Sequence, residues 1–171
     1  MWTGGVRVII FDEDKRILMV RQHHENKDIW MLPGGAIEDY EDARQAAARE
    51  VKEETGLDVT IEKMVWHVEE VSENRGQRFV NFFLAKRCGG NLELGYDPEL
   101  FGQEQVMKEV RFISREELKN LENVYPDYLR EEIWDFTDYF FGLEKFEGHL
   151  ESEVLSVLKK RDKTYDSFKL R

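Results

Sequence analysis

The sequence changes character between residues 34 and 57, which read GGAIEDYEDARQAAAREVKEETGL. This stretch opens on a glycine pair, and glycine adopts backbone angles that other residues avoid. From Asp42 to Thr55 it consists mostly of Ala, Arg, Glu, Gln and Lys, which are strong helix formers. Gly56 stands where a helix would stop. We therefore expect a glycine turn followed by a helix that ends at Thr55.

Three carboxylates crowd one side of this expected helix. With 3.6 residues in each turn, Glu50, Glu53 and Glu54 fall within an arc of about 100°. A charge run of this kind is commonly a solvated helix face. If the three side chains are partly buried, they need a cation, and Mg²⁺ accepts oxygen ligands while keeping several waters. Helix composition alone leaves both interpretations open and favours the solvated face.

The same positions suggest how a cation would be held. Carboxylates four residues apart, at Glu50 and Glu54, can chelate one ion, and Glu53 can serve a second. Arg49 lies beside Glu53 on the helical wheel and can fix a carboxylate rotamer through hydrogen bonds. The preceding turn, Gly34-Gly35, can direct a carbonyl oxygen at a metal or let a phosphate approach closely.

The spacing across the whole stretch is more specific than its composition. Gly35 is followed after five residues by Glu41, and after seven more by Arg49-Glu50-Val51-Lys52-Glu53-Glu54-Thr55-Gly56-Leu57. This run resembles the Nudix box, G-x5-E-x7-R-E-U-x-E-E-x-G-U, where U is aliphatic, and it fits at every fixed position. The spacing therefore favours a metal site over a solvated face.

The resemblance implies a fold, an activity and a set of roles. The fold would be an α/β/α sandwich with a mixed β-sheet between helices. The activity would be Mg²⁺-dependent, with Mn²⁺ possible, and would hydrolyse a phosphoanhydride bond in a nucleoside diphosphate linked to another group. The implied metal ligands are Glu50, Glu54, Glu53 and the Gly35 carbonyl.

The resemblance also implies catalytic and supporting roles. Glu53 would be a further ligand or position water, Arg49 would orient Glu50 or Glu53, and Glu41 would support without binding metal. Some members of the family use a distal Glu as the base. Glu104 is the best candidate by position, Glu109 is a weaker one, and an ordinary exposed loop residue is the alternative.

Several segments around the box read as strands. Val6–Phe11 and Arg16–Arg21 flank the turn Asp12–Lys15, so we expect them to pair as a hairpin. Residues 22–28 read as a loop and residues 29–32 as a short strand. Later strands are expected at residues 59–69, 77–86 and 109–113, followed by the S-x-x-E capping box of Ser114 and a helix over residues 128–141. Together these elements predict an α/β layer fold.

We expect two parts along the chain. Residues 1–141 would form the Nudix domain, and residues 142–171 would be a C-terminal helical extension. Leu150, Val154, Val157 and Leu158 form a helical apolar stripe within residues 149–161. That stripe would pack on the same domain or at a dimer interface, and a homodimer is possible.

Composition and charge narrow the classes of partner. The chain has 171 residues, a formal net charge of −11 and a sequence pI of about 4.9. An acidic surface repels polymeric nucleic acid and anionic lipid, so the expected partner is a small nucleotide. Cys88 is the single cysteine, and we found no targeting signal or apolar run of membrane-spanning length. A cytoplasmic location is therefore expected.

The identity of the substrate is less constrained. The sequence motifs typical of the ADP-ribose, dinucleoside polyphosphate and coenzyme A hydrolases of this family are absent from this sequence. Arg21, Arg75 and Arg78 are candidate phosphate contacts, with ordinary surface residues as the alternative. Trp30 would stack on a base or pack in the core. His23-His24 would bind metal or be exposed loop histidines, and the latter is favoured.

Three function classes follow from these patterns. The first is a metal-dependent nucleotide pyrophosphohydrolase. The second is a catalytically silent Nudix-fold module that binds nucleotides or regulates. The third is an acidic interaction domain whose Glu-rich helix is only solvated. The complete set of box carboxylates favours the first.

Overall fold

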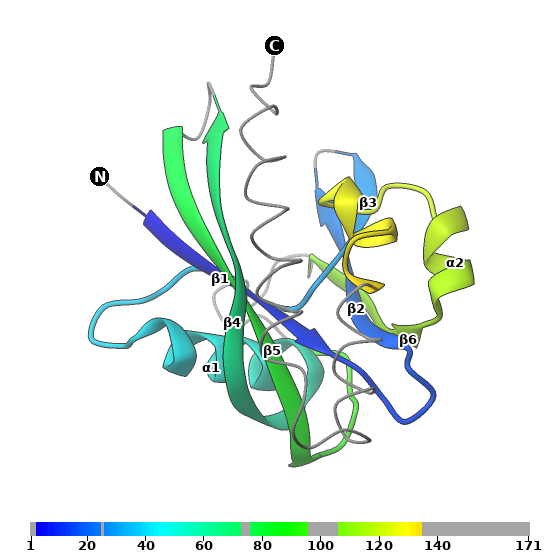
Figure 1. Ribbon diagram of the computed structural model, residues 1–171, viewed down its shortest axis with the longest axis horizontal. Coiled ribbons are helices and arrows are strands. Elements are labelled where there is room, and N and C mark those ends of the chain that lie inside the picture. The colour runs from blue at the N-terminus through cyan, green and yellow to red at the C-terminus, as the bar shows by residue number, and fades with distance from the viewer. Residues whose placement is uncertain (1–2, 25, 73–75, 96–105, 135–171) are drawn as a thin grey trace, which may run out of the picture. The chain divides into compact units, whose positions relative to one another are not determined.

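The computed structural model describes residues 3–24, 26–72, 76–95 and 106–134 (Figure 1). Its strands are β1 (Thr3–Ile10), β2 (Ile17–His24), β3 (Lys27–Met31), β4 (Leu57–Ser72), β5 (Gly76–Gly90) and β6 (Met107–Ile113). Its helices are α1 (Ala43–Thr55), α2 (Arg115–Asn120) and the 3-10 helix η2 (Asp127–Arg130). Along the described part of the chain, three strands precede α1, and three more strands precede α2 and η2, so strands and helices are mixed as in an α/β fold.

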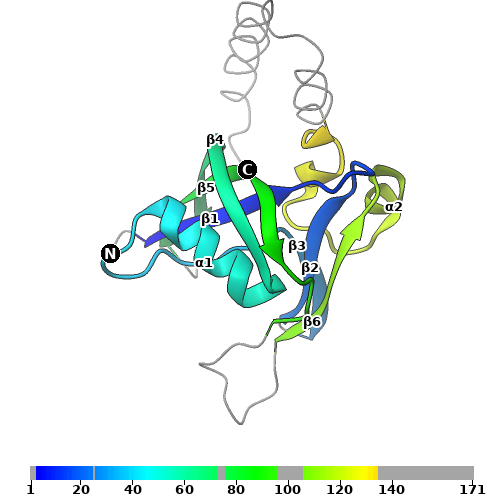
Figure 2. The same ribbon diagram turned by 90° about the horizontal axis from the view of Figure 1, so that it is seen from below.

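The strands form two three-stranded sheets. The first has the order β1-β5-β4 and is mixed, because β1 runs parallel to β5 while β4 runs antiparallel to it. The second has the order β3-β2-β6 and is antiparallel throughout. In both views α1 lies along the first sheet, and the strands of the second sheet lie together beside it (Figures 1 and 2).

The expected hairpin between the first two strands is wrong. β1 pairs in parallel with β5 along its full length and joins β2 only through one bridge, Phe11 to Ile17. The turn between them does form, since the Asp12 carboxylate accepts from the amide of Arg16 at 2.8 Å. The two strands leave this turn into different sheets because Val8, Ile9 and Ile10 are all fully buried, so both faces of β1 are covered.

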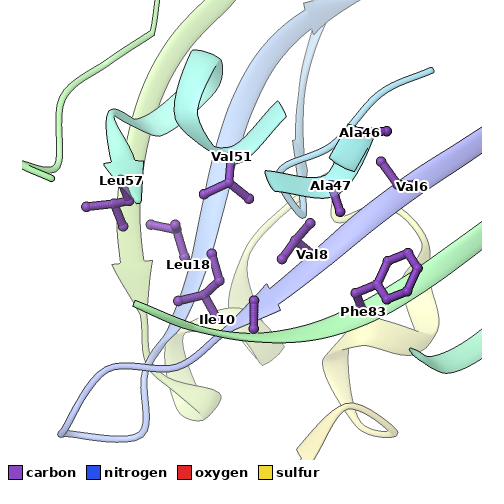
Figure 3. Close-up of a cluster of buried hydrophobic side chains, with 10 residues drawn as sticks. Val6, Val8, Ile10, Leu18, Ala46, Ala47, Val51, Leu57 and Phe83 are labelled. Carbon is purple, nitrogen blue, oxygen red and sulfur yellow. The ribbon is translucent and has the colours of Figure 1, made fainter. Parts of the chain in front are cut away.

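One core cluster lies between α1 and the first sheet. Val51 of α1 packs among Val8 and Ile10 of β1, with Leu18 and Leu57 closing the same cluster (Figure 3). Ala46 and Ala47 are also fully buried there. Their small side chains let the helix approach β1 closely, and this packing fixes which side of α1 is left for the carboxylates.

Both ends of α1 carry the signals that its sequence predicts. The Asp42 carboxylate accepts from the Arg44 and Gln45 backbone amides. In turn, the Gln45 side-chain oxygen accepts from the Asp42 backbone amide. This is a complete capping box. At the other end Gly56 has φ +72° and its amide donates to the Lys52 carbonyl. The helix predicted over residues 42–55 is confirmed.

The glycine turn runs along the free edge of β1. The Val6 amide donates to the Gly35 carbonyl at 2.9 Å, and the Val8 amide donates to the Pro33 carbonyl at 2.9 Å. Gly34 has φ +139°, and a Cβ there would overlap the Val6 carbonyl. Only glycine satisfies both conditions, so the turn is locked against β1 just before α1 begins.

Other expected elements shift by a few residues. The loop predicted over residues 22–28 is wrong, because β2 continues to His24 and β3 already begins at Lys27. β4 and β5 each extend beyond the predicted strands because their antiparallel ladder continues to the pair Leu57–Gly90. The helix α2 begins after Ser114, whose hydroxyl accepts from the Glu117 amide.

The chain divides into two compact units, residues 1–130 and residues 131–171. All the named strands and helices belong to the first unit. The predicted helix over residues 128–141 begins as η2, and its part beyond residue 134 lies outside the described residues, as do the 141/142 boundary and the C-terminal stripe. Among the described residues no helix is both long and apolar enough to cross a membrane.

The glycine turn gives a first testable prediction. Gly34→Ala should lower the free energy of unfolding by about 2–4 kcal/mol, because it combines an unfavourable φ with overlap of the Val6 carbonyl. The matched control is Gly76→Ala, where φ is +71° and the added methyl meets open space, so about 1 kcal/mol is expected. Urea unfolding of both variants measures the difference, and equal losses would contradict the overlap.

Candidate functional site

Glu54 is the most enclosed carboxylate of the box. It projects from the last turn of α1, and its two oxygens accept from the Gly34 amide at 2.8 Å and from the Gln22 side chain at 2.7 Å. Burial raises the pKa of Glu54 to about 7, while the nearby Arg7 guanidinium acts in the opposite direction. The glycine turn and β2 therefore hold this carboxylate in a fixed position.

Glu50 lies one turn earlier on the same helix and is also largely buried. Its side chain is 14% exposed, and burial raises its pKa while Arg49 opposes the rise. A Cβ added at Gly35 would overlap its carboxylate. The missing side chain of Gly35 thus leaves the space that the Glu50 carboxylate occupies.

Arg49 ties the surrounding carboxylates together. Its guanidinium makes two hydrogen bonds to Glu41, at 2.7 and 3.1 Å, which hold the pKa of that carboxyl below its ordinary value. It also donates to Glu50 at 3.1 Å and to Glu53 at 3.0 Å. Arg49 therefore contacts Glu50 and Glu53, the two carboxylates that it was expected to orient. Glu41 is a third carboxylate that binds Arg49.

The donor set suits a hard divalent cation. Glu50 and Glu54 are two enclosed carboxylates, and burial raises the pKa of each. The charge of Glu50 raises the pKa of Glu54 further, and Glu53 is 45% exposed beside them. Oxygen donors of this kind favour Mg²⁺ or Mn²⁺ over softer ions. Among the described residues no three His, Cys, Asp or Glu side chains converge into a metal cage. Arg49 donates hydrogen bonds to Glu50 and Glu53, and the Gly34 amide donates one to Glu54.

The predicted carbonyl ligand at Gly35 faces β1. Its oxygen accepts the Val6 amide, which leaves one lone pair of the carbonyl for another partner. The neighbouring Gly34 carbonyl accepts from the Arg7 guanidinium. Each of the two carbonyls therefore already has one hydrogen-bond donor.

Some other candidates are engaged elsewhere. Arg21 forms ion pairs with Asp28 and Glu109, each at 2.9 Å, and lies over the Trp30 ring. Trp30 itself is 7% exposed, with the Arg111 guanidinium 4.9 Å from its ring centre. This placement favours core packing for Trp30.

The remaining candidates fall into two groups. Within the described residues, Arg78 pairs with Glu70, and His23 bonds Asp28 at 2.7 Å. Glu104 and Arg75 lie outside the described residues, as does the side chain of His24.

Two neighbours of the site were missed in the sequence. Gln22 holds Glu54, yet a polar residue at a strand end carries no signal for such a contact. Arg7 interacts electrostatically with both Glu54 and Glu50. Its position inside the apolar run Val6–Phe11 was a signal, because strand alternation places it opposite Val6 and Val8.

Comparison with known proteins identifies the family. A family model described as the NUDIX domain matches residues 1–133. The chain belongs to the NUDIX family. A solved structure called a NUDIX hydrolase, from Nitrosomonas europaea, superposes with a TM-score of 0.65 at 19% identity, covering 87% of this chain and 98% of that one. This likeness confirms the predicted fold class.

Sequence relatives carry several activities in their names. An ADP-ribose pyrophosphatase of Methanocaldococcus jannaschii is 30% identical over 71% of this chain and 70% of its own length. An RNA pyrophosphohydrolase of Pelagibacter ubique is 23% identical over 91% of this chain and 90% of its own length. Two shorter matches, in Bacillus subtilis and Streptomyces rubellomurinus, span 40% and 27% of those proteins.

The Arg49 contacts give a second prediction. Because Arg49 lowers the pKa of Glu41, their pairing stabilises the fold above the ordinary pKa of a glutamate, and this contribution disappears as Glu41 is protonated. Arg49→Gln should therefore lower the free energy of unfolding by about 1–2 kcal/mol at pH 7. The deficit should shrink as the pH falls below about 4.

The control for this prediction is Arg44→Gln on the same helix. Arg44 is exposed and donates to the Ile61 carbonyl at 3.0 Å. Its deficit should be smaller and should not shrink with acidity. Chemical unfolding at a series of pH values measures both variants, and a constant deficit for Arg49→Gln would contradict the assigned pairing.

Proposed function

We propose that this protein is a pyrophosphohydrolase that uses Mg²⁺ or Mn²⁺ to cleave a phosphoanhydride bond in a nucleoside diphosphate linked to another group. The observation that carries the proposal is the enclosed pair Glu50 and Glu54, which the fold holds beside the glycine turn. The family and the diphosphatase and pyrophosphatase names of its relatives support the same reaction class.

Glu50 and Glu54 would hold the metal, with Glu53 as a further ligand or a partner of water. A divalent ion held there would screen phosphate charge and lower the pKa of bound water. Burying two carboxylates without a cation is costly, and the raised pKa of each reflects that cost. The site is therefore built to gain stability when a cation arrives.

The other side chains of the site would hold the proposed metal ligands in position. Arg49 would keep Glu50 and Glu53 in their rotamers, while Glu41 would keep Arg49 in its own. The Gly34 amide and Gln22 would hold Glu54 against rotation. Hydrolysis forms a bond between a water oxygen and one phosphorus and breaks the bond to the bridging oxygen. With the reacting groups held in place, positioning and electrostatics would supply most of the rate.

The finer features of the proposal follow from the sequence. The net charge of −11 favours a small nucleotide over polymeric nucleic acid as substrate, and the single cysteine is consistent with a cytoplasmic location.

Glu104 remains our candidate for the base, with Glu109 weaker because it pairs with Arg21 and Arg111. The segment 142–171 remains a candidate dimer surface.

Glu54→Gln tests the metal assignment. It should reduce turnover at saturating Mg²⁺ by about 100-fold or more, since one arm of the chelate is lost while the fold is kept. Glu62→Gln, at an exposed position of β4, is the matched control and should keep full activity. Products are measured from nucleoside di- and triphosphates, ADP-ribose, sugar nucleotides and dinucleotides. Near-normal turnover in Glu54→Gln would refute the assignment.

Metal addition gives a readout that does not need the substrate. Mg²⁺ or Mn²⁺ at 100 times its dissociation constant should add about 2.7 kcal/mol to the free energy of unfolding, and chelation should remove it. Glu54→Gln should lose most of this gain, and Glu62→Gln should retain it. A stabilised protein that turns over no member of the panel would favour the silent nucleotide-binding module.

A further inference from the structure

Two arginines lie on the face of the first sheet that is turned away from α1. Val6 and Val8 of β1 pack in the cluster beneath the helix, so alternation places Arg7 on the opposite face. Arg7 pairs in register with Phe82 of β5. Arg78 is four residues before Phe82 on the same strand and therefore shares that face. β1 and β5 lie side by side in Figure 1.

Arg78 is held in place by Glu70, which Tyr125 also contacts. Its guanidinium bonds the Glu70 carboxylate of β4 at 2.6 Å, and the Tyr125 hydroxyl donates to the other oxygen of that carboxylate at 3.3 Å. The Tyr125 amide donates to the Trp30 carbonyl at 2.8 Å, so this tyrosine is anchored on β3. The contact from Tyr125 to Glu70 therefore joins the two sheets beside Arg78.

Arg7 lies between this cluster and the box carboxylates. Burial lowers its pKa, and so does the charge of Arg78, while Glu54, Glu50 and Glu70 raise it. Its guanidinium donates to the Gly34 carbonyl, which is its only hydrogen bond to the described residues. A guanidinium has five N–H donors, and four of them have no acceptor among the described residues.

We propose that Arg7 and Arg78 form a cationic subsite for the substrate phosphate farthest from Glu50 and Glu54, with Glu70 and Tyr125 positioning Arg78. Arg7 and Arg78 act on each other electrostatically, and the single Glu70 carboxylate offsets only one of the two guanidinium charges. Arg binds phosphate through paired, charge-assisted hydrogen bonds. The inference rests on the proposed function, because it assigns the far end of the same substrate.

This subsite bears on the class of substrate. The protein has a net charge of −11 and repels anions in general, so phosphates need local cations to bind. A terminal phosphate is charged and would use the arginine pair, whereas an uncharged sugar would not. The pair therefore favours nucleoside triphosphates over diphosphates whose far group is neutral, such as ADP-ribose.

The test compares Arg78→Gln with Arg87→Gln in the full chain. Arg87 is an exposed arginine of the same strand that donates to the Gly89 and Gly90 carbonyls, so it controls for loss of a charge on β5. Binding of inorganic tripolyphosphate is measured by calorimetry in EDTA, where no metal contributes. Arg78→Gln should weaken binding by about 10-fold or more, and Arg87→Gln should leave it within about 2-fold.

Kinetics supply the second readout. With a nucleoside triphosphate, Arg78→Gln should raise KM by about 10-fold and change kcat by less than about 3-fold, while KM for ADP-ribose should change little. Arg78→Lys should recover part of the loss because it restores the charge. Tripolyphosphate affinity in Arg78→Gln equal to that in Arg87→Gln would overturn the subsite.

The two proposals fail in different ways. Glu54→Gln should lose turnover but bind tripolyphosphate in EDTA at least as tightly as the parent protein does, because it removes a negative charge beside Arg7 and leaves both arginines in place. Loss of turnover with unchanged Arg78-dependent binding supports both proposals. Normal turnover in Glu54→Gln with Arg78-dependent binding would refute the metal assignment and leave the subsite standing.

Discussion

The carboxylate of Glu54 is enclosed by α1, the glycine turn and β2, and this enclosure constrains the elements around it. The Gly34 amide reaches Glu54 only because Gly34 adopts φ +139° against the edge of β1. Gln22 reaches it only because β2 belongs to the second sheet and passes the end of α1. A carboxylate held this way is poorly solvated, and its pKa rises to about 7. The fold thus maintains a group that is unfavourable without a cation.

Arg49 and Arg7 counter this charge from opposite sides. Arg49 is on the same helix and joins Glu41, Glu50 and Glu53 into one network. Arg7 comes from β1 and is shared electrostatically between Glu54 and the Glu70–Arg78 pair. These two cations offset part of the negative charge of the box carboxylates. The subsite that we propose assigns Arg7 and Arg78 to a substrate phosphate.

The two sheets place these groups near one another. β1 leaves the turn at Asp12 for the first sheet while β2 enters the second, so the site collects residues from both. Tyr125 reaches from beside β3 to Glu70 of β4, and Gln22 reaches from β2 to the end of α1. Had β1 and β2 formed the expected hairpin, Arg7 and Gln22 would lie in one sheet, and this enclosure would not exist.

The sequence by itself determined what depends on local chemistry. Helix formers between Asp42 and Gly56 specify α1 and its caps. The spacing from Gly35 to Leu57 predicts the family, which the family model confirms, and the carboxylates that we propose as metal ligands. Only the tertiary structure decided which strands pair and which distant residues meet. Strand pairing depends on long-range burial of both faces of β1, which short-range patterns do not record. Contacts such as Gln22 to Glu54, 32 residues apart, therefore had no sequence signal. Arg7 had a partial one, since a charge in an apolar strand must face something polar.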